Sequence, residues 1–340
     1  MQTLRLAAFA LATILVIVSP SHAQSVAEFY KGKQLTMIIG SAPGGGYDAW
    51  ARVIARHMGK HIPGNPSFVP QNMPGAGTLI AANHLYSIAP KDGTVVGGIS
   101  RDAPLAPLTG AEGRFDAHKF TWLGSPTAET NVCIAHQRSG VKTFADLQQR
   151  ELLVGDTGPG TGTHVFPHVL NAILGTKFKP IAGYKGGPDV FLAMERGEVN
   201  GICESLDAVM RRGADKLKKG EITILFQGGA EPNPSIKDVP FIFDFAKTEE
   251  QKQTLTFVYA GQGIGRPFVA PPDVPADRVK ALRDAFDATM KDPEFIEDAK
   301  KQKLEVEPVK GEKIAAILKQ IYATPKPVID KVGQILQSGK

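Results

Sequence analysis

Four glycine-rich segments of this chain are suited to binding an anion through the backbone. Each follows an apolar run and precedes an apolar stripe at helical spacing: 40–46, 72–78, 156–162 and 184–187. A helix N-terminus leaves N–H groups unpaired and carries partial positive charge, and glycine lets a ligand's oxygens approach closely. Such a site binds an anion without a catalytic side chain. One glycine turn also serves simple tight turning, but four in succession predict a binding site. We expect Gly45 and Gly75 in particular to require positive φ.

These loops do not match the phosphate-binding motifs of nucleotide-binding proteins. Gly40 and Gly45 have the glycine spacing of a P-loop, but Gly46 and Tyr47 stand where lysine and serine or threonine are needed. No strand is followed by G-x-G-x-x-G with an acidic residue about 20 positions on. The sequence therefore predicts no nucleotide and no cofactor.

Motifs of enzymes and metal sites are also missing from the sequence. It contains no G-x-S-x-G turn and no H-E-x-x-H helix. His164 and His168 are four residues apart, but Pro167 lies between them and no third ligand is evident. We interpret them as polar residues of a helix's first turn, and His57 and His61, near an expected helix end, as surface residues. No catalytic residue and no metal ligand is predicted.

Three polar residues near the loops are candidates for a role in binding. Ser100 and Arg101 directly follow an apolar strand at 94–99, at the sheet edge where ligand loops gather. Arg101 is suited either to a carboxylate or to a surface ion pair with Asp102. Asp48 is placed to cap the first helix, and a structural role suits it better than direct contact with an anion.

The candidate ligand-binding residues come from these loops and from polar positions close to them. In the first half of the chain they are Ala42, Pro43, Gly44, Gly45, Gly46, Tyr47, Asp48, Pro74, Gly75, Ala76, Gly77, Thr78, Ser100 and Arg101. In the second half they are Thr157, Gly160, Thr161, Thr163, Tyr184, Lys185 and Asp207.

The elements that position these loops repeat one unit: an apolar strand, a glycine turn and an amphipathic helix. The unit begins with strands at 35–39, 68–69 and 152–154, and a further helix follows Pro188. Alternating strands and helices with short turns predict an α/β fold with parallel sheets covered on both faces. Helices follow Pro275 and Pro293 near the end of the chain.

The first 23 residues have the pattern of a cleaved signal peptide. Leu6–Val18 is almost wholly apolar, and small residues flank His22 as at a cleavage site near Ala23. A single membrane anchor is the alternative, but this apolar run is shorter than the roughly 20 residues needed to span a bilayer. We expect export to the periplasm and a soluble mature chain, long enough for two lobes.

Charge and cysteine content limit the partners and the redox chemistry. The net charge of +5 is mild, and no basic stripe with interleaved aromatic residues predicts a nucleic-acid partner. Cys133 and Cys203 are the only cysteines, both in strand-like runs. An exported protein meets oxidising conditions, so the two cysteines can form a disulfide, but two buried free thiols are equally ordinary. We slightly favour the free thiols.

Several short motifs resemble the extracytoplasmic receptors of tripartite tricarboxylate transporters, often called Bug proteins. Segment 42–48 is similar to the family's first ligand loop and segment 72–77 to its second, and 90–93, 184–187, 195–199, 238–240 and 270–275 follow in the family's order. The resemblance implies a type II periplasmic-binding-protein fold with two α/β lobes and a hinge of crossing strands. It implies di- or tricarboxylates, acidic amino acids or aromatic acids as ligands. Departures at Tyr47, Ser41–Ala42 and Gly183–Tyr184 leave the ligand's identity open.

From this resemblance we expect lobe one at 24–126 plus 266–340 and lobe two at 127–265, with crossings near 126–133 and 263–268. The expected function is a monomeric periplasmic receptor that captures a small carboxylate for the membrane subunits of a tripartite transporter. A receptor for a sensor kinase and a periplasmic lyase or hydrolase are the alternatives.

Overall fold

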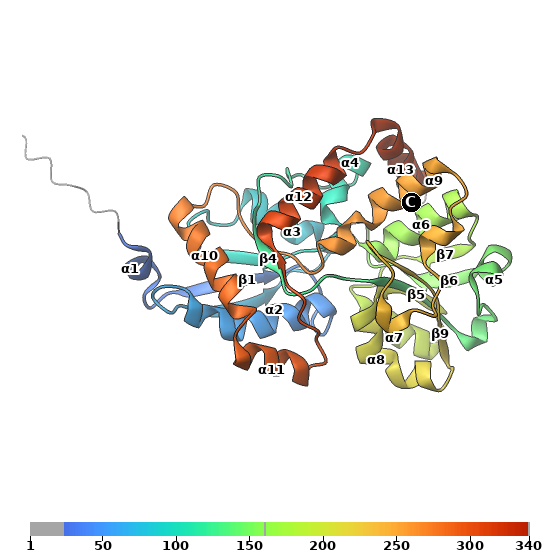
Figure 1. Ribbon diagram of the computed structural model, residues 1–340, viewed down its shortest axis with the longest axis horizontal. Helices are drawn as coiled ribbons and strands as arrows, with labels where there is room; N and C mark the ends of the chain where they lie inside the picture. The colour runs from blue at the N-terminus through green and yellow to red at the C-terminus, as the bar shows by residue number, and fades with distance from the viewer. Residues whose placement is uncertain (1–23, 160, 339–340) are drawn as a thin grey trace, which may run out of the picture.

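The computed structural model describes residues 24–159 and 161–338, which form two β-sheets with helices around each (Figure 1). The predicted signal peptide at 1–23 and the candidate ligand residue Gly160 lie outside the described residues. Within the described ranges, no helix is both long and apolar enough to span a membrane.

The first sheet combines strands from the two ends of the chain. Its order is β11-β4-β10-β3-β1-β2. Strand β1 pairs in parallel with β2 and β3, whereas β10 runs antiparallel to β3 and β4. The strands are β1 (Gln34–Ile39), β2 (Ser67–Asn72), β3 (Val95–Gly98), β4 (Thr121–Ser125), β10 (Phe268–Ala270) and β11 (Val309–Lys310).

The second sheet uses only the middle of the chain, in the order β7-β6-β8-β5-β9. Apart from the edge strand β11, this order repeats that of the first sheet, with β6 parallel to β7 and β8, and β5 antiparallel to β8 and β9. The strands are β5 (Asn131–His136), β6 (Leu152–Gly155), β7 (Phe178–Ile181), β8 (Gly201–Ser205) and β9 (Ile222–Gly228).

The prediction of parallel sheets is wrong for the strands that follow a crossing between the sheets. Strand β5 follows β4 of the first sheet, and β10 follows β9 of the second sheet after a helix at Glu249–Tyr259; both run antiparallel to their neighbours. A parallel pair is usually joined by a crossover that begins and ends in the same sheet, whereas each of these two strands is reached from the other sheet. Both sheets are therefore mixed.

The predicted helices are present, and four begin directly after the predicted glycine loops: α2, α3, α6 and α7. The helices are α1 (Val26–Tyr30), α2 (Gly46–His57), α3 (Leu79–Ser87), α4 (Ala106–Thr109), α5 (Phe144–Gln149), α6 (Gly162–Leu174), α7 (Gly187–Arg196), α8 (Leu206–Lys218), α9 (Glu249–Tyr259), α10 (Ala276–Thr289), α11 (Pro293–Lys301), α12 (Gly311–Tyr322) and α13 (Lys326–Ser338). The four helices α2, α3, α6 and α7 therefore each begin at a loop that follows the carboxyl end of a strand.

The last helix packs against elements around both sheets. Helix α13 contacts α4 on one side and α6 and α9 on the other (Figure 1). One apolar core cluster accordingly includes Ile38 of β1, Phe166 of α6 and Val332 of α13. We propose that residues 24–126 and 266–340 form lobe one and 127–265 form lobe two, with α13 lying across their junction.

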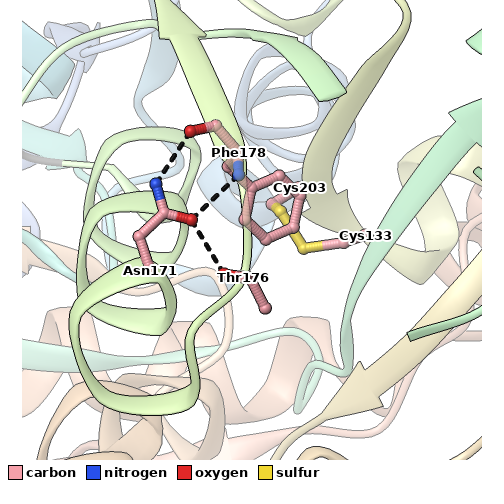
Figure 2. Close-up of a disulfide and its surroundings, with 5 residues drawn as sticks. All are labelled: Cys133, Asn171, Thr176, Phe178 and Cys203. Carbon is pink, nitrogen blue, oxygen red and sulfur yellow. Dashed lines mark hydrogen bonds between the residues drawn. A yellow bond between two sulfur atoms is a disulfide. The ribbon is translucent and has the colours of Figure 1, made fainter. Parts of the chain in front are cut away.

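Cys133 and Cys203 form a disulfide, so the slight preference for free thiols was wrong (Figure 2). The two residues lie directly opposite each other on β5 and β8, with Cα atoms 4.0 Å apart. Nearby, the Asn171 side chain fixes the end of α6 to the start of β7: its amide donates to the Phe178 carbonyl, and its oxygen accepts from the Phe178 N–H. Strand register, which brings the thiols together, is set by tertiary pairing.

Replacing both cysteines with alanine should lower the free energy of unfolding by about 2–4 kcal/mol. The disulfide joins residues 70 positions apart, and its loss frees a long loop in the unfolded chain. Urea unfolding without reductant measures the change. Reductant should lower the wild-type midpoint and leave that of the variant unchanged. Equal midpoints for both proteins without reductant would contradict a stabilising disulfide.

Candidate ligand-binding site

A cavity of about 710 Å³, partly open to solvent, lies where the loops of the two sheets face each other. The cavity is formed by loops at the carboxyl ends of β1, β2 and β3, and by those of β6, β7 and β8. Loops from this end of parallel strands converge on a ligand in open α/β sheets.

The structure brings most of the candidate residues together around this cavity. Those that line it are Ala42, Gly45, Gly46, Tyr47, Gly75, Gly77, Thr78, Ser100, Arg101, Thr157, Thr161, Thr163 and Lys185. Others lie outside the lining, although in the same loops or beside them: Pro43, Gly44, Asp48, Pro74, Ala76, Tyr184 and Asp207.

The remaining lining residues were not predicted. They are Gly40, Ser41, Asp102, Asn131, Gly162, Gly186, Gly187, Cys203, Glu204, Ser205 and Arg266. Most belong to the selected loops or extend them by a residue, and the end of β8 obeys the same sheet-edge rule. Asn131 and Arg266 lie in the two expected crossing segments, so they could have been predicted from the sequence by selecting the polar residues of those segments.

Asp48 orders the first loop from inside the helix, which corrects its predicted role as a cap. The N-cap is Gly45, and Asp48 is the third residue of α2. Its carboxylate accepts from the Gly44 N–H at 2.8 Å, from Arg52 at 2.9 Å and from Asn72 at 2.8 Å. Burial raises the pKa of Asp48, but these hydrogen bonds outweigh burial and hold the pKa below its usual value. A buried anion thus stabilises the loop without facing the cavity.

The start of α2 presents backbone donors to the cavity. Gly46 and Tyr47 both line it, and among the described residues the structure records no acceptor for their N–H groups. Gly46 also has no room for a side chain, because a Cβ there would lie 2.5 Å from Nη1 of Arg266. The Arg266 guanidinium packs over the Tyr47 ring, 4.5 Å from its centre.

The expectation of positive φ is correct for Gly75 and wrong for Gly45. Gly75 has φ 139°, whereas Gly45 has φ −71°, and the left-handed residue of the first loop is Gly44, with φ 78°. Thr78 is left-handed without being glycine, and its hydroxyl accepts from the Ser100 N–H at 2.9 Å. The Thr78 hydroxyl therefore helps to hold a backbone conformation that is costly for a β-branched residue.

The loops of the two sheets touch beside the cavity. A Cβ on Gly158, after β6, would lie only 2.8 Å from the Gly77 nitrogen, after β2. A Cβ on Gly186 would lie 3.5 Å from that of Ala42. Glycine at these positions allows the two sides of the cavity to come this close.

A buried cluster of two arginines and two carboxylates forms one end of the cavity. Glu129 accepts from Arg101 at 2.8 Å through one oxygen and from the Arg266 Nε–H through the other. Arg266 also donates to Asp207 at 2.8 Å. Of the two alternatives for Arg101, the surface ion pair with Asp102 is therefore wrong: Arg101 is buried, and its partner is Glu129.

The charges in this cluster compensate one another. Burial raises the pKa of Glu129, and the arginines offset part of that increase. Burial also acts to raise the pKa of Asp207, but Arg266 and then Arg211 outweigh it and bring the pKa to about 2. Within the cluster, Arg101 and Arg266 are each paired with a carboxylate. The exposed Lys185 lines the cavity, and no ion pair is recorded for it with the part of the chain that is described.

Several buried polar atoms on the lining have no partner among the described residues. They are Oγ of Ser41, both amide atoms of Asn131, Nε of Arg101 and Oδ1 of Asp102. Buried polar groups are almost always hydrogen-bonded in folded proteins. Each of these atoms has almost no accessible surface, so a ligand reaches them only after side chains of the lining move.

The model of the tripartite tricarboxylate transporter family receptor matches residues 50–334 of the chain. The chain belongs to this receptor family. Its members are periplasmic solute-binding proteins, so the family is one of receptors and not of enzymes. The receptor is 24% identical over 337 residues to a UPF0065 protein of Cupriavidus necator, covering 96% of each chain.

Solved structures confirm the predicted periplasmic-binding-protein fold for the receptor. The periplasmic binding protein BugD superimposes with a TM-score of 0.70 at 19% identity, covering 91% of this chain and 98% of BugD. MatC from Rhodopseudomonas palustris, with bound malate, gives 0.68 at 18% identity, covering 90% and 99%. Another R. palustris protein, with adipate, gives 0.69 at 20% identity, covering 90% and 98%.

Replacing Asp207 with asparagine should make the receptor less sensitive to acid. The pKa of this carboxyl is about 2 when folded and near 3.8 when unfolded. Its contribution to stability, about 2 kcal/mol, is complete above about pH 4 and is lost as the pH falls towards 2. Urea unfolding at pH 5 and pH 2.5 should show a smaller loss for Asp207→Asn than for the wild type.

The matched control is Asp284→Asn, which removes an exposed carboxylate paired with Lys280. An exposed pair of this kind contributes little to stability, so this variant should lose as much between pH 5 and pH 2.5 as the wild type. If Asp207→Asn also behaves as the wild type, Asp207 does not stabilise the cluster in the way the geometry implies.

Proposed function

We propose that this receptor is periplasmic, captures a small carboxylate in the cavity and delivers it to the membrane subunits of a tripartite transporter. The observation that carries this proposal is the pair of unpaired N–H groups of Gly46 and Tyr47, which line the cavity at the positive end of α2. A carboxylate is bound well by such groups. The arginines beside it are already neutralised by Glu129 and Asp207.

The side of the cavity formed by the second sheet suits a second polar group on the same ligand. Lys185 lies on the loop after β7 and can pair with a second carboxylate. Malate and adipate, which the two R. palustris proteins hold, are both dicarboxylates. A dicarboxylate that spans the cavity from α2 to Lys185 is therefore our first candidate.

The acceptors on the lining favour a ligand that also carries a hydroxyl or amino group. Asp102 and Asn131 line the cavity, and each has a buried side-chain oxygen without a recorded partner among the described residues; Glu204 lines the same space. These oxygens accept hydrogen bonds, so a purely hydrocarbon chain between two carboxylates leaves them unpaired. Hydroxy dicarboxylates and acidic amino acids fit this pattern better than unsubstituted diacids.

A screen of carboxylates by thermal shift and calorimetry tests the proposal. A ligand at 100 times its Kd should stabilise the fold by roughly 2.7 kcal/mol. Malate, glutamate, adipate and benzoate sample the candidate classes. Intact recovery of the bound acid supports a receptor, whereas chemical conversion supports the enzyme alternative. If none of a broad set of carboxylates binds, the proposal is wrong.

Gly45→Val should abolish binding of the best carboxylate without unfolding the protein. Gly45 has a φ that valine adopts. A Cβ there would lie 3.3 Å from the Ala42 carbonyl oxygen and 3.6 Å from Oγ of Ser41, so a branched side chain would displace the loop residues that line the cavity beside the α2 amides. Lys185→Ala should weaken the binding of a dicarboxylate by about 1.5–3 kcal/mol, and Lys185→Arg should restore part of it. Calorimetry on variants with wild-type circular dichroism measures both.

Ala182→Val is the control, because it adds a branched side chain at an exposed position outside the lining. It should bind as the wild type does. A folded Gly45→Val variant with wild-type affinity would exclude the backbone amides of α2 as the carboxylate site.

A further inference from the structure

A second cluster of polar side chains lies outside the cavity, at the end of β6 and the start of α6. Asp156 follows β6 directly, and His164 and His168 lie one turn apart on α6. Asp156 and His164 are 3% and 6% exposed, and His168 is half-buried. None of the three lines the ligand cavity.

The three side chains lie close enough to share one ion. One potential ligand atom from each lies within 4.8 Å of those of the other two. The imidazole rings of His164 and His168 are 4.6 Å apart between centres. Two histidines four residues apart on one face of a helix are a common pair of metal ligands. Helix α6 is continuous across Pro167, so the proline does not separate them.

Asp156 fixes the orientation of the His164 ring. One carboxylate oxygen lies 2.7 Å from Nδ1 of His164, and the other accepts from the Gly158 N–H at 2.8 Å. Because an ionised carboxylate only accepts, Nδ1 carries a proton, and Nε2 is the nitrogen left to meet a ligand. In metal sites, a carboxylate commonly accepts a hydrogen bond in this way from the histidine nitrogen that does not bind the metal, and so fixes the orientation of the ring.

The other ring nitrogen of His164, Nε2, has no hydrogen-bond partner within the described ranges. This nitrogen is also buried. An unpaired buried polar atom is costly, so a native structure normally gives it a partner.

A second histidine cluster lacks these properties. His57 and His61 are half-buried and bound to Asp298 and Asp292 of the α11 region, so their interpretation as surface residues was wrong. The Lys60 ammonium lies 2.6 Å from Asp292, next to the same histidines. A cation is already present at that carboxylate, so a metal ion would have to displace it.

We propose that His164 and His168 bind one divalent transition-metal ion of the zinc class through their imidazole nitrogens, with Asp156 as the positioning residue. Imidazole ligands suit Zn²⁺, Cu²⁺ and Ni²⁺ better than Mg²⁺ or Ca²⁺. Water completes the coordination. From the sequence this site was excluded because no third ligand was evident; the fold brings Asp156 from the end of β6 to orient His164, which spacing along the chain does not reveal.

The experiment titrates the tag-free mature protein with Zn²⁺ in a calorimeter and follows ¹⁵N-labelled histidines by NMR. One Zn²⁺ should bind per chain, with shifts confined to His164 and His168. Asp156→Asn should weaken binding about 10–100-fold and change the tautomer signals of His164. His168→Gln removes a ligand and should weaken binding more than Asp156→Asn does.

The His57→Gln, His61→Gln double variant is the matched control, since it removes another pair of histidines four residues apart. It should bind Zn²⁺ as the wild type does. Unchanged affinity in His168→Gln, loss of binding in the control or absence of Zn²⁺ binding would each overturn the proposal. If His168→Gln does not fold, the NMR shifts of the wild-type histidines decide.

Discussion

Glu129 and Arg266 lie on the two segments by which the chain passes between the sheets, and they bind each other in the interior. Glu129 is on the way from β4 to β5, and Arg266 precedes β10. Isolated in the interior, either charge would carry a large desolvation cost. Arg101 on one side and Asp207 on the other complete the pairing, so strands, loops and helix starts from both sheets are tied to one point.

The ligand cavity depends on this cluster in a direct way. The Arg266 guanidinium occupies the space beside Gly46 and covers the Tyr47 ring, so it forms the wall against which the first turn of α2 rests. Because both arginines are paired with carboxylates, the positive potential at the start of α2 comes from its backbone. The site thus separates two roles: side-chain charges fix the geometry, and main-chain amides together with Lys185 are left to meet an anion.

Features that depend on neighbouring residues could be predicted from the sequence, whereas features that depend on pairing between distant segments could not. The strand–glycine turn–helix units depend on neighbouring residues, and helices α2, α3, α6 and α7 begin at the predicted turns. The disulfide, the direction of β5 and the Arg101–Glu129 pair depend on the register of segments far apart in the chain. Periodicity carries no information on such register. The alternative of a surface ion pair for Arg101 rested on Asp102, which is adjacent in sequence but is not the partner of Arg101.

The contacts between the two sides of the cavity differ between the loops and the crossings. Gly158 meets Gly77 at the side of the cavity, with no charged pair recorded between those two loops in the described ranges. The contacts at the crossings are buried ion pairs, and helix α13 packs across the same junction. The recorded contacts between the two sheets are therefore charged at the crossings and uncharged where Gly158 meets Gly77 beside the cavity.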